Sequence, residues 1–298
     1  MNRTSSEVWI KPGAGTFGDD HHYAEERPAY IANEGGFWID RHSVTNAQFA
    51  SFVNDTGYVS DAEREGGNVF IATTAPVDLR QPSLWWRHEA RASWRRPRGT
   101  DALAAEHDDH PVVQVTHRDA LAYAAWSGQR LPTEPEWEWA AGGGQPPTAT
   151  WPLAPDGMLL ANVWLGEFPW KLVRKGTPTT MPVGSFPANF RGLFDMLGNV
   201  WEWTSDPWES RHGTQAHATQ RQDGIDIVSS CCATTDTDAI TVKGGSYLCA
   251  ANYCARYRPS ARHAQAANEP TCHIGFRCAR SGDDLADPPE AERAVARS

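Results

Sequence analysis

Two cysteines five residues apart, Cys249 and Cys254, are the side chains in this sequence whose type and spacing could do chemistry. They lie in residues 243–258, KGGSYLCAANYCARYR, where two glycines allow a sharp turn and Ser246 places a hydroxyl three residues before the first thiol. The spacing is too long for a thioredoxin-like C-x-x-C and is not typical of zinc fingers. Two thiolates with no histidine between them would suit Cu(I), a soft metal, although reduced buried thiols and a structural disulfide are open alternatives.

The elements that must position these thiols begin with helix-capping patterns. A capping box of Thr45 with Gln48 predicts a helix that ends at Gly57. The same pattern predicts helices over residues 116–128 and 133–142. Short runs rich in β-branched and aromatic residues predict strands at residues 36–40, 112–115, 240–243 and 274–278.

These short elements, without a clean linker between them, favour a single α+β domain over residues 1–280. The 14 Trp, 25 Gly and 21 Pro indicate long loops that are packed by large rings. We expect a polar surface excursion from about residue 210 to residue 238, and a loose acidic tail at residues 281–298.

Charge and hydropathy exclude several classes of protein. The formal net charge of −10 argues against a general nucleic-acid binder. No stretch approaches the roughly 18 apolar residues of a membrane span, and the first residues lack the apolar core of a signal peptide. We therefore expect a monomeric cytoplasmic protein with no membrane or nucleic-acid partner.

Four further blocks accompany the cysteine segment, namely residues 44–49 (VTNAQF), 130–139 (RLPTEPEWEW), 198–206 (GNVWEWTSD) and 274–278 (IGFRC). Together the five blocks resemble the formylglycine-generating enzymes, the copper-dependent oxidase branch of the sulfatase-modifying factor family. The resemblance runs from about Gly36 to Cys278 and implies that family's fold, a variant of the C-type-lectin-like scaffold.

The resemblance also implies a chemistry. Cys249 and Cys254 would hold Cu(I), and a cysteine of an unfolded sulfatase-like polypeptide, in a Cys-x-Pro-x-Arg motif, would add its own thiolate. With O2 as co-substrate, a hydrogen would leave the substrate's β-carbon, and the resulting thioaldehyde would hydrolyse to formylglycine. Ser246 and Trp201 match positions that line the family's oxygen-side pocket, and Tyr253 helps to shape it; local hydrogen bonding and core packing are the alternatives for these three residues.

A structural calcium site is implied at residues 195–202, with side-chain oxygens from Asp195 and Glu202 and backbone carbonyls from Gly198 and Val200. The competing interpretation is a turn in which Asp195 only caps amides. The family's first calcium site, which begins like Asn162 and Val163, is expected to be absent or rebuilt here. Residues 170–176 carry cations where that site requires an acidic side chain, and cations do not bind calcium.

The other cysteines and the histidines carry weaker expectations. The family's disulfide partner of Cys278 is missing, so we expect Cys278 to be a buried free thiol. Cys231 and Cys232 are expected to be an unpaired surface pair, whereas the role of Cys272 is open. His107, His110 and His117 lie near Asp108 and Asp109, and we expect this cluster to be solvated rather than to bind a metal.

Two other functions stay open. The same fold and copper chemistry could act on a different peptidyl or small thiol, because Ala250 and residues 170–176 depart from the family pattern. Alternatively, the chain could be a non-catalytic lectin-like binding module, although such a module has no use for the thiol pair. Copper binding separates these functions.

Overall fold

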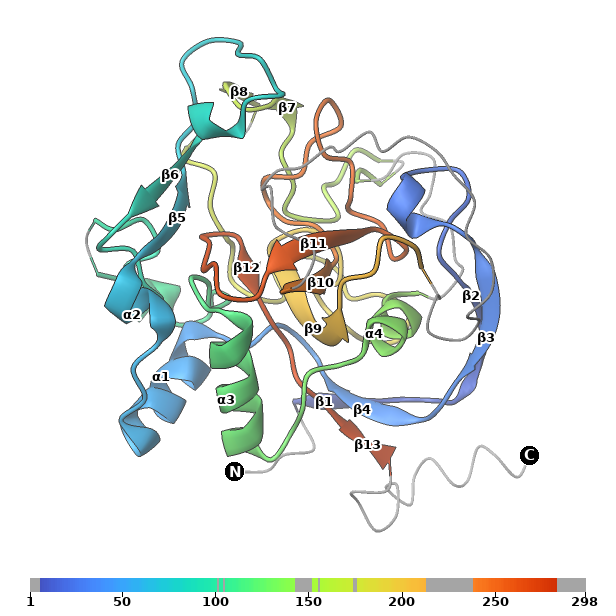
Figure 1. Ribbon diagram of the computed structural model, residues 1–298. Coiled ribbons are helices and arrows are strands. Elements are labelled where there is room, and N and C mark those ends of the chain that lie inside the picture. The colour runs from blue at the N-terminus through green and yellow to red at the C-terminus, as the bar shows by residue number, and fades with distance from the viewer. Residues whose placement is uncertain are drawn as a thin grey trace.

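A four-stranded sheet lies at the centre of the fold (Figure 1). Its order is β11-β10-β9-β12, and it consists of β9 (Trp201–Pro207), β10 (Ala239–Lys243), β11 (Arg262–Ala266) and β12 (Ile274–Gly275). β10 pairs antiparallel with both β11 and β9, and β12 runs parallel to β9. The structure is a computed structural model that describes residues 6–100, 102–103, 105–142, 152–154, 156–173, 176–212 and 238–282.

The remaining strands form one further sheet and three hairpins. The second sheet has the order β1-β4-β13, from β1 (Glu7–Ile10), β4 (Phe37–Asp40) and β13 (Ala279–Ser281), so the last strand ends one residue beyond the predicted domain boundary. The hairpins pair β2 (Gly13–Phe17) with β3 (Tyr30–Glu34), β5 (Gly67–Phe70) with β6 (Trp86–Glu89), and β7 (Gly166–Glu167) with β8 (Lys171–Leu172). Short 3-10 turns lie at η2 (Ala24–Glu26), η3 (Pro82–Leu84) and η4 (Ala105–His107).

The three predicted helices are confirmed as α1 (Asn46–Thr56), α3 (His117–Ser127) and α4 (Glu134–Ala141). Each has a complete capping box at its N-terminus. A threonine hydroxyl accepts the backbone N–H of the third helical residue, and the side chain of that residue accepts the backbone N–H of the threonine. The sequence analysis missed a fourth helix, α2 (Asp61–Glu65), although Ser60 and Glu63 form the same box. Among the described residues no helix has both the length and the apolar character that a membrane span requires.

The strand predictions have mixed outcomes. Those at residues 36–40 and 240–243 are confirmed as β4 and β10, whereas only Ile274–Gly275 of residues 274–278 forms a strand. The prediction of a strand at residues 112–115 was wrong. This run is buried, but Gln114 adopts a left-handed φ of 59°. Its N–H groups therefore bond separate loops, Val112 to Val44 and Gln114 to Thr271, and do not form a ladder.

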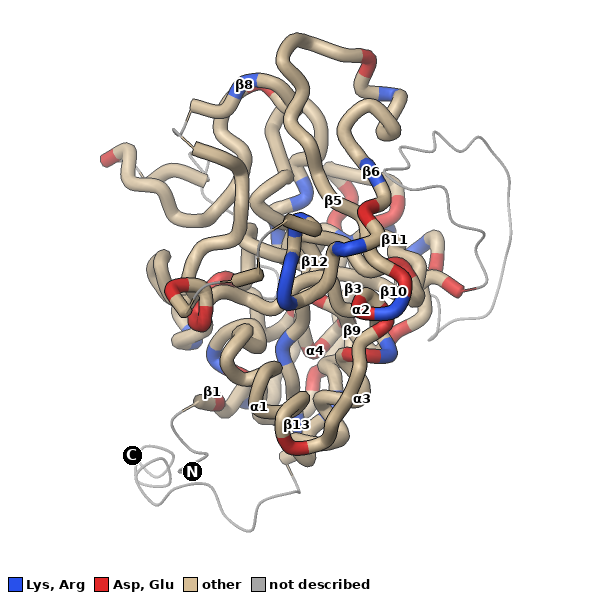
Figure 2. The backbone as a smooth tube through the Cα atoms, turned by 90° about the vertical axis from the view of Figure 1, so that its left-hand side faces the viewer, with Lys and Arg blue, Asp and Glu red and all other residues tan. Residues whose placement is uncertain are grey.

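The mixture of short strands and a few helices confirms the predicted α+β class. Aromatic rings pack the helices and loops onto the sheets. Phe49 of α1 stacks on Tyr123 of α3 with ring centroids 6.0 Å apart, and Phe276 meets both rings edge-on. On the other side of the central sheet, α4 contacts β9 and β10 (Figure 1). Basic and acidic positions are interspersed along the described chain (Figure 2).

One buried carboxylate, that of Glu202 on β9, joins several of these elements. Its Oε1 accepts hydrogen bonds from Ser43 Oγ at 2.7 Å and Arg277 Nη2 at 2.8 Å. Its Oε2 accepts from Trp137 Nε1 at 2.7 Å and Arg277 Nε at 2.6 Å. Glu202 and Arg277 are both fully buried, so neither charge has solvent as a substitute partner.

This geometry predicts that Arg277→Met lowers the free energy of unfolding by about 3–5 kcal/mol, because it leaves the Glu202 charge buried and uncompensated. Urea-induced unfolding measures the change. The control is Arg87→Met, which removes an exposed partner of Glu89 and should cost about 0–1 kcal/mol. Equal, small effects in both variants would contradict a central role for the pair.

Candidate functional site

The turn after β10 carries the first thiol and depends on two glycines. Gly244 and Gly245 have φ values of 93° and 74°. A Cβ at Gly244 would lie 2.7 Å from the Met196 carbonyl, and one at Gly245 would lie 2.7 Å from the Arg256 carbonyl. No other residue type fits both the backbone angle and this close approach. The turn thereby brings Ser246 and Cys249 against the segment that contains Cys254.

The two thiols meet at the end of this turn. Cys249 Sγ and Cys254 Sγ are 3.5 Å apart, which is hydrogen-bonding distance for a thiol and a thiolate, and both are almost fully buried. Donation from Cys249, helped by the nearby Arg256 guanidinium, lowers the pKa of Cys254 to about 6. Burial raises the pKa of Cys249 well above its usual range. The arrangement therefore favours a pair with one proton, in which Cys254 is the anionic sulfur.

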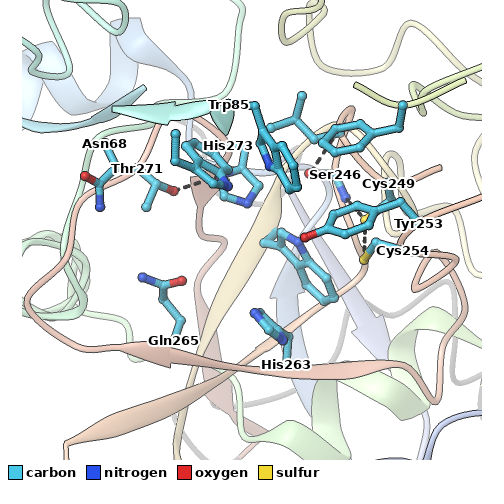
Figure 3. Close-up of a pocket in the computed structure, with 14 residues that line it drawn as sticks. Asn68, Trp85, Ser246, Cys249, Tyr253, Cys254, His263, Gln265, Thr271 and His273 are labelled. Carbon is cyan, nitrogen blue, oxygen red and sulfur yellow. Dashed lines mark hydrogen bonds between the residues drawn. The ribbon is translucent and has the colours of Figure 1, made fainter. Parts of the chain in front are cut away.

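Both thiols line one cavity, and Figure 3 shows them together at one side of it. Ser246, Trp201 and Tyr253 line the same cavity, so the structure brings together the five predicted catalytic residues. The cavity encloses about 40 Å³. That is room for roughly three water molecules, and therefore for the end of a side chain rather than for a folded segment.

The sequence analysis missed the opposite end of this cavity. Asn68, Gln265 and Thr271 lie there, away from the thiols in Figure 3, and His263 and His273 lie between them and the thiols. Burial lowers the pKa of both histidines to about 3, so they are neutral near pH 7. Within the part of the chain that the structure describes, the residues that line the cavity include no Asp, Glu, Lys or Arg. No local sequence signal marks these positions, because they come from separate loops and strands.

Several rings form the remaining wall of the cavity. Tyr253 stacks on Phe168 with ring centroids 4.7 Å apart and almost parallel planes, and Trp85 meets Tyr253 edge-on. The side-chain amide of Asn252 accepts the Phe168 N–H and donates to the Phe168 carbonyl. This wall therefore fixes Tyr253, which precedes the second thiol.

The predicted calcium loop has one carboxylate that suits a cation and one that does not. Asp195 Oδ2 accepts the Gly184 N–H at 2.7 Å, and burial raises the pKa of Asp195 to about 6. Glu202, in contrast, accepts two hydrogen bonds on each oxygen. These bonds use the roughly four lone-pair directions of a carboxylate. As folded, Glu202 is the partner of Arg277 and does not fit the predicted role of calcium ligand.

At the family's first calcium site, the Asn162 amide donates to the Thr179 carbonyl and to Asn199 Oδ1, at 3.0 and 3.1 Å. Residues 174 and 175 of the cationic loop lie outside the described residues. The loss of this site therefore stays a prediction.

The other described cysteines and the three histidines of the predicted cluster do not line the cavity that holds the thiol pair. Cys278 is a buried free thiol, as expected. Cys272 lines a second cavity of about 230 Å³ and bonds to Tyr247 Oη. His117 bonds to the Thr204 carbonyl and lies apart from His107 and His110, which line the second cavity half-buried rather than solvated. Cys231 and Cys232 lie outside the described residues.

A buried group of potential metal ligands, Glu134, Glu138 and His212, was not predicted. Lys243 Nζ lies 2.9 Å from Glu138 and 3.4 Å from Glu134, and Arg262 also pairs with Glu134. Because these two cations already balance the two carboxylates, the cluster joins α4 to β10 and β11 and has no need of a metal ion.

Comparison with known proteins gives one consistent family. Residues 1–282 match the family described as "Sulfatase-modifying factor enzyme 1-like domain". The chain is 44% identical to a Mycobacterium tuberculosis protein named formylglycine-generating enzyme, over 94% of this chain and 97% of that one. It is 33% identical to a Bos taurus protein named inactive C-alpha-formylglycine-generating enzyme 2, over 82% and 76%. The solved structure of PvdO from Pseudomonas aeruginosa shares the fold, with a TM-score of 0.62 and 23% identity over 92% and 94%.

The inequality of the two thiols can be tested in the metal-free protein. Of the four cysteines that the structure describes, iodoacetamide should modify Cys254 first, with a rate that rises as the pH increases through about 6, because only the thiolate reacts. Cys249, Cys272 and Cys278 should react only at higher pH, since burial raises the pKa of each. Peptide mass spectrometry locates the modified residue. First modification at Cys249, or a midpoint near the ordinary thiol pKa of about 8.5, would contradict this assignment.

Proposed function

We propose that this chain, which belongs to the sulfatase-modifying factor family, oxidises a cysteine of a sulfatase polypeptide to Cα-formylglycine. The observation that carries the proposal is the thiol pair, with sulfurs 3.5 Å apart in the wall of a small cavity. The relatives named formylglycine-generating enzyme support the reaction, and their similarity covers nearly the whole chain.

The thiol pair fits Cu(I). It offers two soft sulfur donors, and the cavity wall presents no carboxylate that would favour a hard cation. Cys249 and Cys254 would hold the metal. When bound, Cu(I) supplies the electron density that activates dioxygen, which makes O2 the co-substrate.

The protein's own residues bind and orient the substrate. The cavity admits a cysteine side chain, while the polypeptide backbone stays at its mouth. An unfolded segment can present a cysteine in this way, whereas a cysteine in a packed domain cannot. Ser246 and Trp201 line the cavity next to the thiols and would shape the space beside the substrate's β-carbon. The rings of Trp85, Phe168 and Tyr253 line another part of the cavity and would exclude water from the same space.

A second candidate keeps this site but changes the substrate to a small thiol. The cavity volume of about 40 Å³ favours it, because a free thiol of that size would also enter. The name of the inactive relative supports a third candidate, a binding module without chemistry. The meeting of both thiols in one cavity argues against that third candidate.

We propose in addition that calcium binds at residues 195–200 through the Asp195 carboxylate and the carbonyls of Gly198 and Val200. The buried carboxylate of Asp195 supports this, since the described salt bridges leave it without a partner of opposite charge. Glu202 keeps Arg277 as its partner and does not bind the ion.

A cytoplasmic location is supported by the four free thiols among the described cysteines.

The main proposal predicts that Cys249→Ser and Cys254→Ser each abolish formylglycine formation in a Cys-x-Pro-x-Arg peptide and leave the melting temperature nearly unchanged. Mass spectrometry of the peptide, incubated in air with copper and a thiol reductant, measures conversion. Cys272→Ser is the matched control and should stay active, because Cys272 lines a different cavity. Tight Cu(I) binding without peptide conversion would favour the small-thiol candidate. Near-native turnover in either of the first two variants would show that the assigned thiol is dispensable.

The calcium proposal predicts that about 1 mM calcium raises the melting temperature, and that excess chelator reverses the shift. Asp195→Asn should abolish the response, because it removes the one charged ligand. Asp156→Asn, at an exposed carboxylate, is the control and should keep the response. A calcium response that survives Asp195→Asn would place the ion elsewhere.

A further inference from the structure

A segment far from the thiols in sequence lies directly against them in the structure. Residues 19–28, which include η2, pack on residues 254–262. The Tyr23 hydroxyl accepts the Ala255 N–H at 3.1 Å, and the Arg256 guanidinium lies over the Tyr23 ring at 3.8 Å. Glu25 Oε1 accepts from Arg256 Nε at 3.0 Å and from Nη2 at 2.6 Å. We call residues 19–28 the N-terminal strap.

These contacts leave the third guanidinium nitrogen for the thiol pair. Arg256 Nη1 lies 3.7 Å from Cys254 Sγ, and Arg256 is only 3% exposed. Glu25 fixes the Nε and Nη2 edge of the planar guanidinium, and the Tyr23 ring fixes its plane. The direction of Nη1 toward the sulfur therefore follows from the strap.

The charge of the metal site explains what this cation would do. Two thiolates and one Cu(I) carry a net charge of −1, and a buried net charge is costly unless an opposite charge compensates it. The cavity wall itself contains no Lys or Arg. Arg256, behind the wall and within hydrogen-bonding reach of Cys254, is the cation that the structure provides.

We propose that Arg256 is the charge partner of the Cys254 sulfur, and that Tyr23 and Glu25 of the N-terminal strap are the positioning residues that hold it there. The copper part of this proposal rests on the proposed function, whereas the contact with the sulfur does not. The motifs of the sequence analysis began at about Gly36 and did not include the strap, although the family match over residues 1–282 does.

A purely structural role is the competing explanation, in which the Arg256–Glu25 pair only fastens the strap. The chain contains a matched control for it. Arg258 pairs with Glu26, the next strap residue, and it also contacts the Ala255 carbonyl and the Tyr23 ring rather than either thiol. Replacing both partners, as Arg258→Met with Glu26→Gln, removes the neighbouring ion pair between the two segments and leaves the contacts of Arg256 with Glu25 and Tyr23 in place, without leaving a buried charge uncompensated.

The experiment measures two quantities in each variant at pH 5, the Cu(I) affinity by competition with a chromophoric chelator and the rate of Cys254 alkylation in the metal-free protein. This pH lies below the Cys254 pKa of about 6, so the metal-free pair is mostly neutral and its negative charge appears only on ionisation or on metal binding. Arg256→Met should weaken Cu(I) binding and slow alkylation by about tenfold or more each, because an opposite charge at this distance has effects of that size. Arg256→Lys should give intermediate losses, since it keeps the charge but cannot bind Glu25 and reach the sulfur together. The control double variant should stay within about twofold of the unmodified protein.

Glu25→Gln tests the positioning role, and its two effects oppose each other. Removing the carboxylate takes away a negative charge near an anionic site, which would strengthen binding slightly. It also frees the guanidinium to turn away from the sulfur, which weakens binding. Because the Glu25 side chain is 20% exposed, solvent screens its charge, so the loss of orientation should dominate. We expect a loss in the same direction as Arg256→Met but smaller.

The outcomes separate the proposals. If Arg256→Met stays within twofold in both measurements, or if the control double variant loses as much as Arg256→Met, the role of Arg256 is overturned. If the unmodified protein binds no Cu(I) but Arg256→Met still slows Cys254 alkylation, the copper assignment fails and the charge partnership stands. An unchanged Glu25→Gln variant would overturn the role of the strap.

Discussion

The fold depends on a buried negative charge that must not lose its partners. Glu202 accepts hydrogen bonds from Arg277, Trp137 and Ser43, and these residues belong to four separate stretches of the chain. An unpaired carboxylate in this position would be expensive, so all four stretches must come together at once. Three of them lie in sequence blocks shared with the family, and Ser43 directly precedes a further block. The buried interaction thus gives a physical reason why these motifs occur together.

The same strand that carries this charge also lines the cavity that holds the thiol pair. Successive side chains of a strand point to opposite faces. On β9, Trp201 lines the cavity while Glu202 faces α4 and Arg277. On β10, Lys243 pairs in register with Glu202 and reaches Glu134 and Glu138, directly before the glycine turn that carries Cys249. The ion pairs of Glu202 and Lys243 therefore fix β9 and the end of β10. The glycine turn that carries Cys249 starts from this fixed end.

Local sequence signals predicted local structure well, because their physics is local. Thr45, Thr116 and Thr133 each cap a helix through residues within one turn. The run at residues 112–115 has strand-like composition, but distant loops decide the partners of its N–H groups. Asn68 on β5 and His273 in the loop before β12 reach the cavity from places far apart in sequence, and Tyr23 and Glu25 lie behind it. The motif identified the thiols, whereas the residues that surround them could come only from the folded structure.

The charge state of the thiol pair bears on which cation the site favours. With one proton shared between Cys249 and Cys254, the pair carries a net charge of −1. Replacing that proton with Cu(I), also monovalent, leaves the net charge unchanged, so the surroundings that stabilise the protonated pair also stabilise the copper-bound pair. A divalent ion would make the centre neutral and leave Arg256 without its anionic partner. In the proposed metal site, the cation behind the cavity and the neutral groups in its wall would therefore act in the same direction, and both would favour a soft monovalent metal over a divalent one.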